Sequence, residues 1–88
     1  MRTMKITITQ PEGLHARPAA QFVQLANRFQ STVKVRHDDR EANGKSIMAV
    51  MSLGASAGAE VELDVQGSDA EQALAELTAF LRSSGGRR

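Results

Sequence analysis

The sequence predicts an α+β fold, an open-faced sandwich in which three helices cover one face of a four-stranded antiparallel sheet. Three observations lead to this prediction. Several short segments alternate polar and apolar residues, segments with helical apolar spacing lie between them, and the elements follow the order β-α-β-β-α-β-α. Because an alternating strand buries one face only, helices on a single side are the economical arrangement. The 88 residues suffice for one small domain, 1–88, with one core.

The first part of the chain predicts a strand and a helix. Polar residues separate Met4, Ile6 and Ile8, so we expect a strand with these three side chains on its buried face. A proline and a glycine within 10–13 predict a turn. The apolar residues that follow have helical spacing and predict a helix ending within 27–30; they are Phe22, Val23, Leu25, Ala26 and Phe29.

The middle of the chain predicts a hairpin and a short helix. Residues 31–36 alternate, two aspartates form a polar turn, and 40–43 is a short return strand. Ser46 follows a glycine turn and precedes an apolar run, so we expect it to be an N-cap. Gly54 is the expected stop, which leaves a helix of about two turns.

The last part predicts a strand followed by a long helix. Residues 60–65 alternate cleanly and place three β-branched or leucine side chains on the core face. Ser68 and Glu71 have the spacing of a capping box and open a helix. The apolar stripe of that helix faces the sheet and consists of Ala73, Leu74, Leu77, Phe80 and Leu81. We expect 83–88 to be a frayed tail.

Composition excludes several classes of function. The net charge is +1 and only 3% of residues are aromatic, which disfavours a small RNA-binding domain, an alternative that this fold class leaves open. The absence of cysteine excludes disulfides, thiolate metal sites and thiol catalysis. The chain shows neither a signal peptide nor an apolar run of membrane-spanning length, so we expect a cytoplasmic protein without membrane insertion.

The stretch 13–20 is the candidate functional motif. It places His15 and Arg17 two residues apart, directly before the first predicted helix. Proline is tolerated in the first turn of a helix, so Pro18 sets the helix start within a residue or two of these side chains. We therefore expect an imidazole and a guanidinium at the N-terminus of a helix.

A helix N-terminus favours phosphoryl chemistry at this histidine. Its unpaired N–H groups and positive dipole end attract anions and disfavour an imidazolium ion, so a neutral His15 ring keeps a lone pair for nucleophilic attack. The same donors, together with Arg17, would stabilise a phosphoryl group on the ring. The alternative is an ordinary cap or surface histidine without chemistry.

The short helix predicts a contact surface. A two-turn helix cannot bury every side, so some of Ile47, Met48 and Met51 should be exposed, and methionine suits a surface that adapts to several partners. The alternative is that all three are core residues. His37 lies beside two aspartates, but one histidine and two adjacent carboxylates lack a ligand spacing, so we expect a solvated turn, no metal site and no cofactor.

The chain resembles the HPr family, the histidine-containing phosphocarrier proteins of the bacterial phosphoenolpyruvate:sugar phosphotransferase system. The resemblance rests on Gly-Leu-His-Ala-Arg-Pro-Ala at 13–19, on Lys-Ser-Ile-Met at 45–48 with its continuation to Gly54, and on the order of strands and helices. It covers 4–82. It implies the open-faced sandwich that the periodicity predicts.

The resemblance also implies the roles of individual residues. His15 matches the histidine that is phosphorylated on Nδ1, Arg17 matches the arginine that contacts the phosphoryl group, and Pro18 matches the proline at the helix start. Ser46 matches the regulatory serine that an ATP-dependent kinase phosphorylates in many Gram-positive bacteria. The residues that match the apolar docking patch are Ala20, Ile47, Met48 and Met51.

The partners implied by the resemblance are enzyme I, the IIA domains of sugar permeases, a serine kinase/phosphorylase and a catabolite-control repressor. The implied function is phosphoryl transport for sugar uptake and phosphorylation by a carrier that is not itself an enzyme. A second hypothesis is a regulatory binding module for catabolite control, switched at Ser46. A carrier that presents one face to successive partners is expected to be a monomer.

Overall fold

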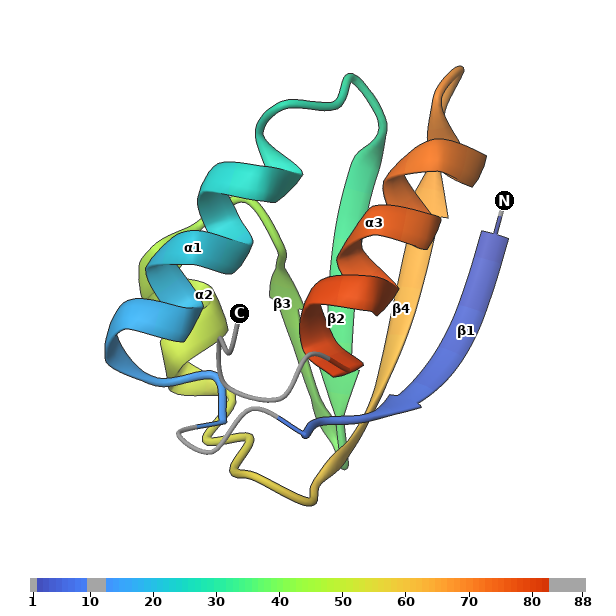
Figure 1. Cartoon of the computed structure of the whole chain (residues 1–88). Coiled ribbons are helices and arrows are strands. Elements are labelled where there is room, and N and C mark those ends of the chain that lie inside the picture. The colour runs from blue at the N-terminus through green and yellow to red at the C-terminus, as the bar shows by residue number, and fades with distance from the viewer. Residues whose placement is uncertain (1, 10–12, 83–88) are drawn as a thin grey trace.

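A computed structural model describes residues 2–9 and 13–82 of the chain. The elements follow the predicted order (Figure 1) and comprise β1 (Arg2–Thr7), α1 (Ala16–Ala26), β2 (Thr32–His37), β3 (Arg40–Asn43), α2 (Ile47–Ser52), β4 (Glu60–Gln66) and α3 (Ala70–Arg82). The expected tail at 83–88 and most of the expected turn at 10–13 lie outside the described residues. The predicted fold class is confirmed.

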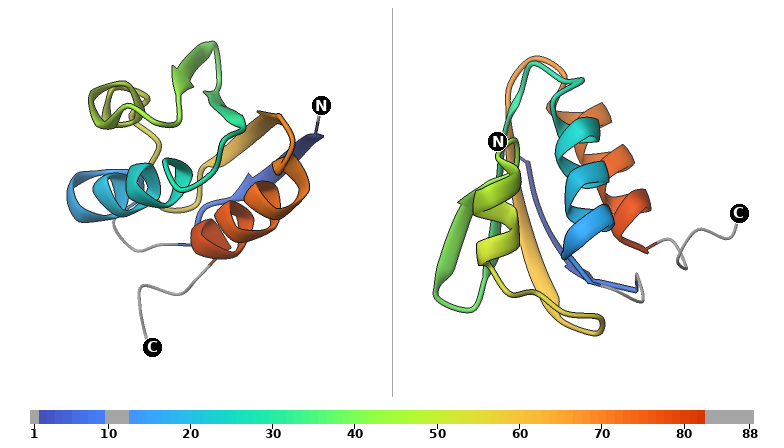
Figure 2. Two further views of the ribbon diagram at one scale, coloured as in Figure 1. Left: turned by 90° about the horizontal axis from the view of Figure 1, so that it is seen from above. Right: turned by 90° about the vertical axis from the view of Figure 1, so that its left-hand side faces the viewer.

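The four strands form one antiparallel sheet in the order β1-β4-β2-β3. The polar return strand β3 pairs with β2 as a hairpin, with His37 opposite Arg40 and Val35 opposite Ala42. Helices α1 and α3 lie together on one side of the sheet, and α2 packs against β3 and α1 (Figure 2). The antiparallel pairing follows from the alternation, because each strand has only one apolar face to bury.

The core lies between the sheet and the helices. Phe22 of α1 and Leu77 of α3 are fully buried, and the ring of Phe22 lies 6.2 Å from that of Phe80. The sheet contributes the alternating residues that the sequence singled out, among them Val33, Val35, Val61, Leu63 and Val65. Burial of such side chains is the main stabilising contribution, about 1.5–3 kcal/mol for each large one.

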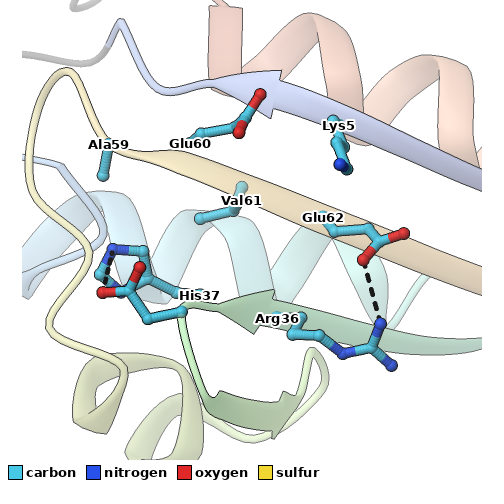
Figure 3. Close-up of a pocket in the computed structure, with 8 residues that line it drawn as sticks. Lys5, Arg36, His37, Ala59, Glu60, Val61 and Glu62 are labelled. Carbon is cyan, nitrogen blue, oxygen red and sulfur yellow. Dashed lines mark hydrogen bonds and ion pairs between the residues drawn. The ribbon is translucent and has the colours of Figure 1, made fainter.

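The opposite face of the sheet carries charged side chains. Arg36 forms an ion pair with Glu62 at 3.0 Å (Figure 3). It also pairs with Asp64 at 3.1 Å and lies 3.5 Å from Glu41. Asp64 above all, then Glu62 and Glu41, raise the pKa of Arg36. This open face is stabilised by cross-strand pairs of opposite charge, and it leaves the apolar residues to the helix side.

The predicted burial of Met4 is wrong. Its side chain is 39% exposed, whereas Ile6 and Ile8 are buried. Strand β1 is an edge strand with β4 as its one neighbour in the sheet, and on the helix side the Thr78 hydroxyl of α3 lies 3.7 Å from the Met4 sulfur. The alternating pattern predicts which face of the sheet a side chain points to, but whether that side chain is buried depends on where the helix lies.

The predicted capping box at Ser68 and Glu71 is also wrong. Helix α3 begins at Ala70, so Asp69 directly precedes it. The Asp69 carboxylate accepts hydrogen bonds from the backbone N–H groups of Gln30 and Ser31, each at 2.9 Å, and from the Ser31 hydroxyl. It thereby anchors the loop between α1 and β2 to the start of α3.

Replacing Asp69 by asparagine is expected to destabilise the protein at neutral pH. The Ser31 hydroxyl bond, and then the Gln30 N–H bond, lower the pKa of Asp69 in the folded state. A lowered pKa contributes stability that is present above the pKa of the unfolded chain, near 3.9, and is lost as the pH falls through the folded value. Urea unfolding of wild type and Asp69→Asn between pH 7 and pH 2 measures the difference in their free energy of unfolding, which should shrink as the pH falls. A difference that stays constant over the whole range would contradict the prediction.

Candidate functional site

The loop that precedes α1 is anchored to the segment that follows α2. Gly13 has a positive φ of 65°, and a Cβ atom there would lie 2.6 Å from the carbonyl oxygen of Ala55, so only glycine fits. The N–H of the next residue, Leu14, donates to that same carbonyl at 2.9 Å, and the Leu14 side chain is fully buried. His15 follows directly, at a defined position beside the end of α2.

His15 is the N-cap residue of α1, as the position of Pro18 predicted. Its backbone is extended (φ −124°, ψ 156°), its carbonyl accepts from the N–H of Ala19 at 3.4 Å, and its side chain makes no capping hydrogen bond. The half-buried imidazole is thus not used to stabilise the helix. A histidine held in this way is available for a ligand or for chemistry.

The backbone between the histidine and the arginine is in an unusual conformation. Ala16 has a φ of 49°, in the left-handed region that residues with a side chain seldom occupy. Such conformations cost about 1–3 kcal/mol and cluster at functional sites. Arg17 is exposed in the first turn of α1, a turn without acidic residues, and the neighbouring Pro18 is buried. The turn therefore presents cationic and N–H groups to solvent.

Helix α2 runs back alongside α1, so His15 and Ser46 lie at opposite ends of this helix pair (Figure 1). The Asn27 side chain at the end of α1 donates both to the Val23 carbonyl and, at 3.3 Å, to the Lys45 carbonyl. The predicted N-cap at Ser46 is confirmed, since its hydroxyl accepts from the N–H of Ala49 at 3.3 Å. Ser46 therefore lies at the start of α2, whereas His15 follows Leu14, which bonds to Ala55 beyond the end of α2.

The predicted exposure on α2 is confirmed. Ile47 is 40% exposed, Met48 76% and Met51 41%. Ala20, on α1, is half-buried. We call Ala20, Ile47, Met48 and Met51 the docking patch. An apolar surface of this kind marks a site of protein contact when it is rimmed by polar groups.

The charge distribution around the docking patch was missed at the sequence level, although the sequence contains the signal. No aspartate or glutamate occurs within 13–37 or 42–59, the ranges that contain α1 and α2, whereas Arg17, Arg28 and Lys45 do. Apart from Glu12, which precedes the His15 loop in the sequence, the acidic residues belong to the β2–β3 hairpin, to β4, and to α3 with the residue before it. Helix α1 and the residues flanking it and α2 therefore carry positive charges only, Arg17, Arg28 and Lys45, and an acidic partner surface fits them.

The predicted turn beside His37 is solvated at Asp38 and Asp39, but the His37 ring is not. The ring is largely buried, and its Nδ1–H donates to the carbonyl oxygen of Leu53 at 3.2 Å. Because a carbonyl can only accept, Nδ1 carries the proton, and Nε2 lies 3.8 Å from the Asp38 carboxylate (Figure 3). Leu53 is 16 residues further along the chain, so no local pattern predicts this bond. Of the two histidines, only His15 lies at a helix N-terminus.

Residues 2–9 and 13–82 contain neither a grouping of side chains suited to a metal ion nor a helix suited to a membrane. In these ranges no three histidine, cysteine or acidic residues are grouped so that they could hold a metal ion. No helix there combines the length and apolar character needed to cross a membrane.

Solved structures show the same fold. The crystal structure of HPr-C-His from Thermoanaerobacter tengcongensis superposes with a TM-score of 0.94 at 44% identity and covers 100% of this chain and 99% of that one. A crystal structure of Crh, described as the Bacillus subtilis catabolite repression containing protein and as a domain-swapped dimer, matches with a TM-score of 0.76 at 45% identity and covers 99% and 100%. The second structure conflicts with the expectation of a monomer, since closely similar chains also associate.

Sequence comparisons agree with the structures. The HPr-like protein Crh of Bacillus subtilis is 48% identical over 93% of this chain and 96% of its own length. The phosphocarrier protein HPr of Lysinibacillus sphaericus is 41% identical over 97% of each chain. The family model "PTS HPr component phosphorylation site" matches residues 2–83. With this match over nearly the whole chain, and with the fold and the His15 motif in agreement, the chain belongs to the HPr family of phosphocarrier proteins.

Proposed function

We propose that this protein accepts a phosphoryl group on His15 from phospho-enzyme I, which takes it from phosphoenolpyruvate, and passes it to sugar-specific IIA domains. The observation that carries the proposal is the placement of His15 at the N-cap of α1, without a capping bond and two residues from Arg17. Membership in a family of phosphocarriers supports the same assignment.

The transfer step is a displacement at phosphorus. The lone pair on Nδ1 of neutral His15 attacks the phosphorus of the donor's phosphohistidine, and the P–N bond to the donor breaks with its electron pair staying on the donor imidazole. Arg17 and the N–H groups of the first turn of α1 stabilise the charge on the moving group. Since one phosphoimidazole replaces another, the reaction is close to thermoneutral and reversible.

Docking is assigned to the docking patch and the cations beside it. Successive partners must reach the same histidine, so they use the same face, and the exposed methionines supply an adaptable apolar contact. The cations Arg17, Arg28 and Lys45 would guide an acidic partner to this face.

The test is the intact mass of the purified protein after incubation with phosphoenolpyruvate and enzyme I. We expect one acid-labile phosphoryl group, and a second incubation with a IIA domain should remove it. An enzyme I preparation that phosphorylates another carrier but leaves this protein unmodified would refute the proposal.

Replacing Met48 by aspartate is expected to weaken docking and to leave the chemical step intact. Met48 is 76% exposed, so the change does not disturb the core, but it puts a charge into the centre of an apolar contact. The KM for phospho-enzyme I should rise about tenfold or more, with kcat little changed. The control Ala75→Asp adds the same charge at an exposed position on α3 and should behave as wild type. An unchanged KM for Met48→Asp would show that the patch is not the docking site.

The second candidate function is a regulatory module for catabolite control, switched by phosphorylation of Ser46. The capping position of Ser46 favours it, because a phosphate there would lie beside the docking patch and add negative charge to a cationic face. A relative of 48% identity is the HPr-like protein Crh, whose crystal structure carries the description of a catabolite repression protein.

A serine kinase/phosphorylase and a catabolite-control repressor would be the partners in that case. Incubation with ATP and such a kinase should add an acid-stable phosphoryl group that is absent from Ser46→Ala. This group is distinguished from the acid-labile one on His15 by its survival in acid, so the two functions can be tested in one protein.

A further inference from the structure

Helix α2 carries most of the docking patch, yet it has only six residues. An isolated helix of this length is unstable in water, because forming its first turn costs more than its few hydrogen bonds return. Only Val50 of the helix is buried. Contacts from outside the helix must therefore hold it in shape.

The C-terminal carbonyl groups of α2 show where those contacts are made. The Val50 carbonyl accepts from the N–H of Leu53 at 3.2 Å, and the Met51 carbonyl accepts from the N–H of Gly54 at 3.3 Å. The next two carbonyls along the chain, those of Ser52 and Leu53, accept from side chains instead. Backbone N–H groups thus satisfy the carbonyls of Val50 and Met51. The carbonyls of Ser52 and Leu53 depend on side chains from another part of the fold.

Both side-chain donors come from the β2–β3 hairpin. Arg40 Nη1 donates to the Ser52 carbonyl at 3.0 Å, and His37 Nδ1 donates to the Leu53 carbonyl at 3.2 Å. His37 and Arg40 are partners in the β-ladder, directly opposite each other at the end of the hairpin. The register of the hairpin therefore places His37 and Arg40 side by side, so that their side chains reach the consecutive carbonyls of Leu53 and Ser52.

These bonds also bear on the position of His15. Leu53 is followed by Gly54 and by Ala55, whose carbonyl accepts the N–H of Leu14 directly before His15. Hydrogen bonds thus link the hairpin to the end of α2, and link the segment just after α2 to the loop that carries His15. A cation next to a helix C-terminus is also favoured by the helix dipole.

We propose that Arg40 and His37 act as positioning residues, which clamp the C-terminus of α2 and so hold the docking patch in the shape that enzyme I recognises. The inference rests on the proposed function, but the clamp itself can be measured without phosphoryl transfer. Both residues belong to the β2–β3 hairpin and bond to the end of α2, not to the helix start that carries His15, so we expect the clamp to act on docking and not on the chemical step.

The experiment compares Arg40→Ala, His37→Phe and His37→Asn with wild type. Amide hydrogen exchange at Leu53 and Gly54 should be about five- to tenfold faster in the first two variants, the effect of losing one hydrogen bond. His37→Asn should keep the wild-type exchange rate, because the asparagine side-chain amide can donate a hydrogen bond from about the position of the histidine Nδ1. Arg2→Ala removes an exposed arginine on the far edge of the sheet and is the matched control for charge.

Kinetics then connect the clamp to docking. Arg40→Ala and His37→Phe should raise the KM for phospho-enzyme I several-fold with kcat unchanged, whereas Arg2→Ala and His37→Asn should not. Wild-type exchange in Arg40→Ala and His37→Phe, with global stability checked by urea unfolding, would overturn the clamp. Faster exchange with an unchanged KM would overturn its role in docking. If wild type took up no phosphoryl group, the proposed function would fail while the exchange result still decided the clamp.

Discussion

Replacing His15 by alanine is expected to abolish uptake of the acid-labile phosphoryl group completely. The nucleophilic lone pair belongs to this imidazole, and alanine offers no atom in its place. Because the His15 side chain makes no capping bond, the change should leave the fold intact. Intact mass after incubation with phosphoenolpyruvate and enzyme I measures the loss, and urea unfolding checks the fold.

His37→Asn is the matched control, since it removes the other histidine but keeps the bond to Leu53. It should take up one phosphoryl group, as wild type does. Retention of an acid-labile group in His15→Ala, or sugar phosphorylation that continues with this variant as the sole carrier, would refute the carrier hypothesis.

Replacing Arg17 by alanine is expected to reduce kcat for transfer about a hundredfold and to change KM much less. The guanidinium is exposed in the first turn of α1, two residues from His15, and we expect it to act on the charge that develops on the phosphoryl group. Losing an interaction made mainly in the transition state lowers kcat more than affinity. Rapid-quench measurement of phosphoryl transfer from phospho-enzyme I separates the two constants.

Arg17→Lys supplies the control, because it keeps the charge and loses the planar pair of donors. Its rate should lie between those of wild type and Arg17→Ala. Wild-type kinetics in Arg17→Ala would exclude the assigned role. A large rise in KM alone would move Arg17 from the chemical step to docking.

The expected effects of these variants differ in kind, which lets the kinetics separate chemistry from docking. His15→Ala removes the acceptor, Arg17→Ala slows the step, and Met48→Asp affects encounter with the partner. The clamp variants at Arg40 and His37 should resemble Met48→Asp in kinetics and differ from it in hydrogen exchange, since Met48 makes no bond that holds the helix end.

Several elements could be predicted because their signals are local. Alternation placed the buried residues of β2 and β4, and Pro18 and Ser46 marked the starts of α1 and α2. The burial of Met4 and the capping box at Ser68 and Glu71 were predicted wrongly for the same physical reason. The surroundings of Met4 and Asp69 come from segments distant in the chain, α3 for Met4 and the Ser31 loop for Asp69.

By itself, the sequence determined the fold class, the histidine motif at a helix start and the apolar surface of a short helix, because periodicity and capping act over a few neighbouring residues. Only the tertiary structure decided what holds that helix. The register of β2 and β3 places Arg40 and His37 together, and their side chains donate to the carbonyls of Ser52 and Leu53. Packing of the loop before α1 against the segment after α2 brings the N–H of Leu14 to the Ala55 carbonyl. These bonds join residues 12 to 41 positions apart, and no local pattern encodes them.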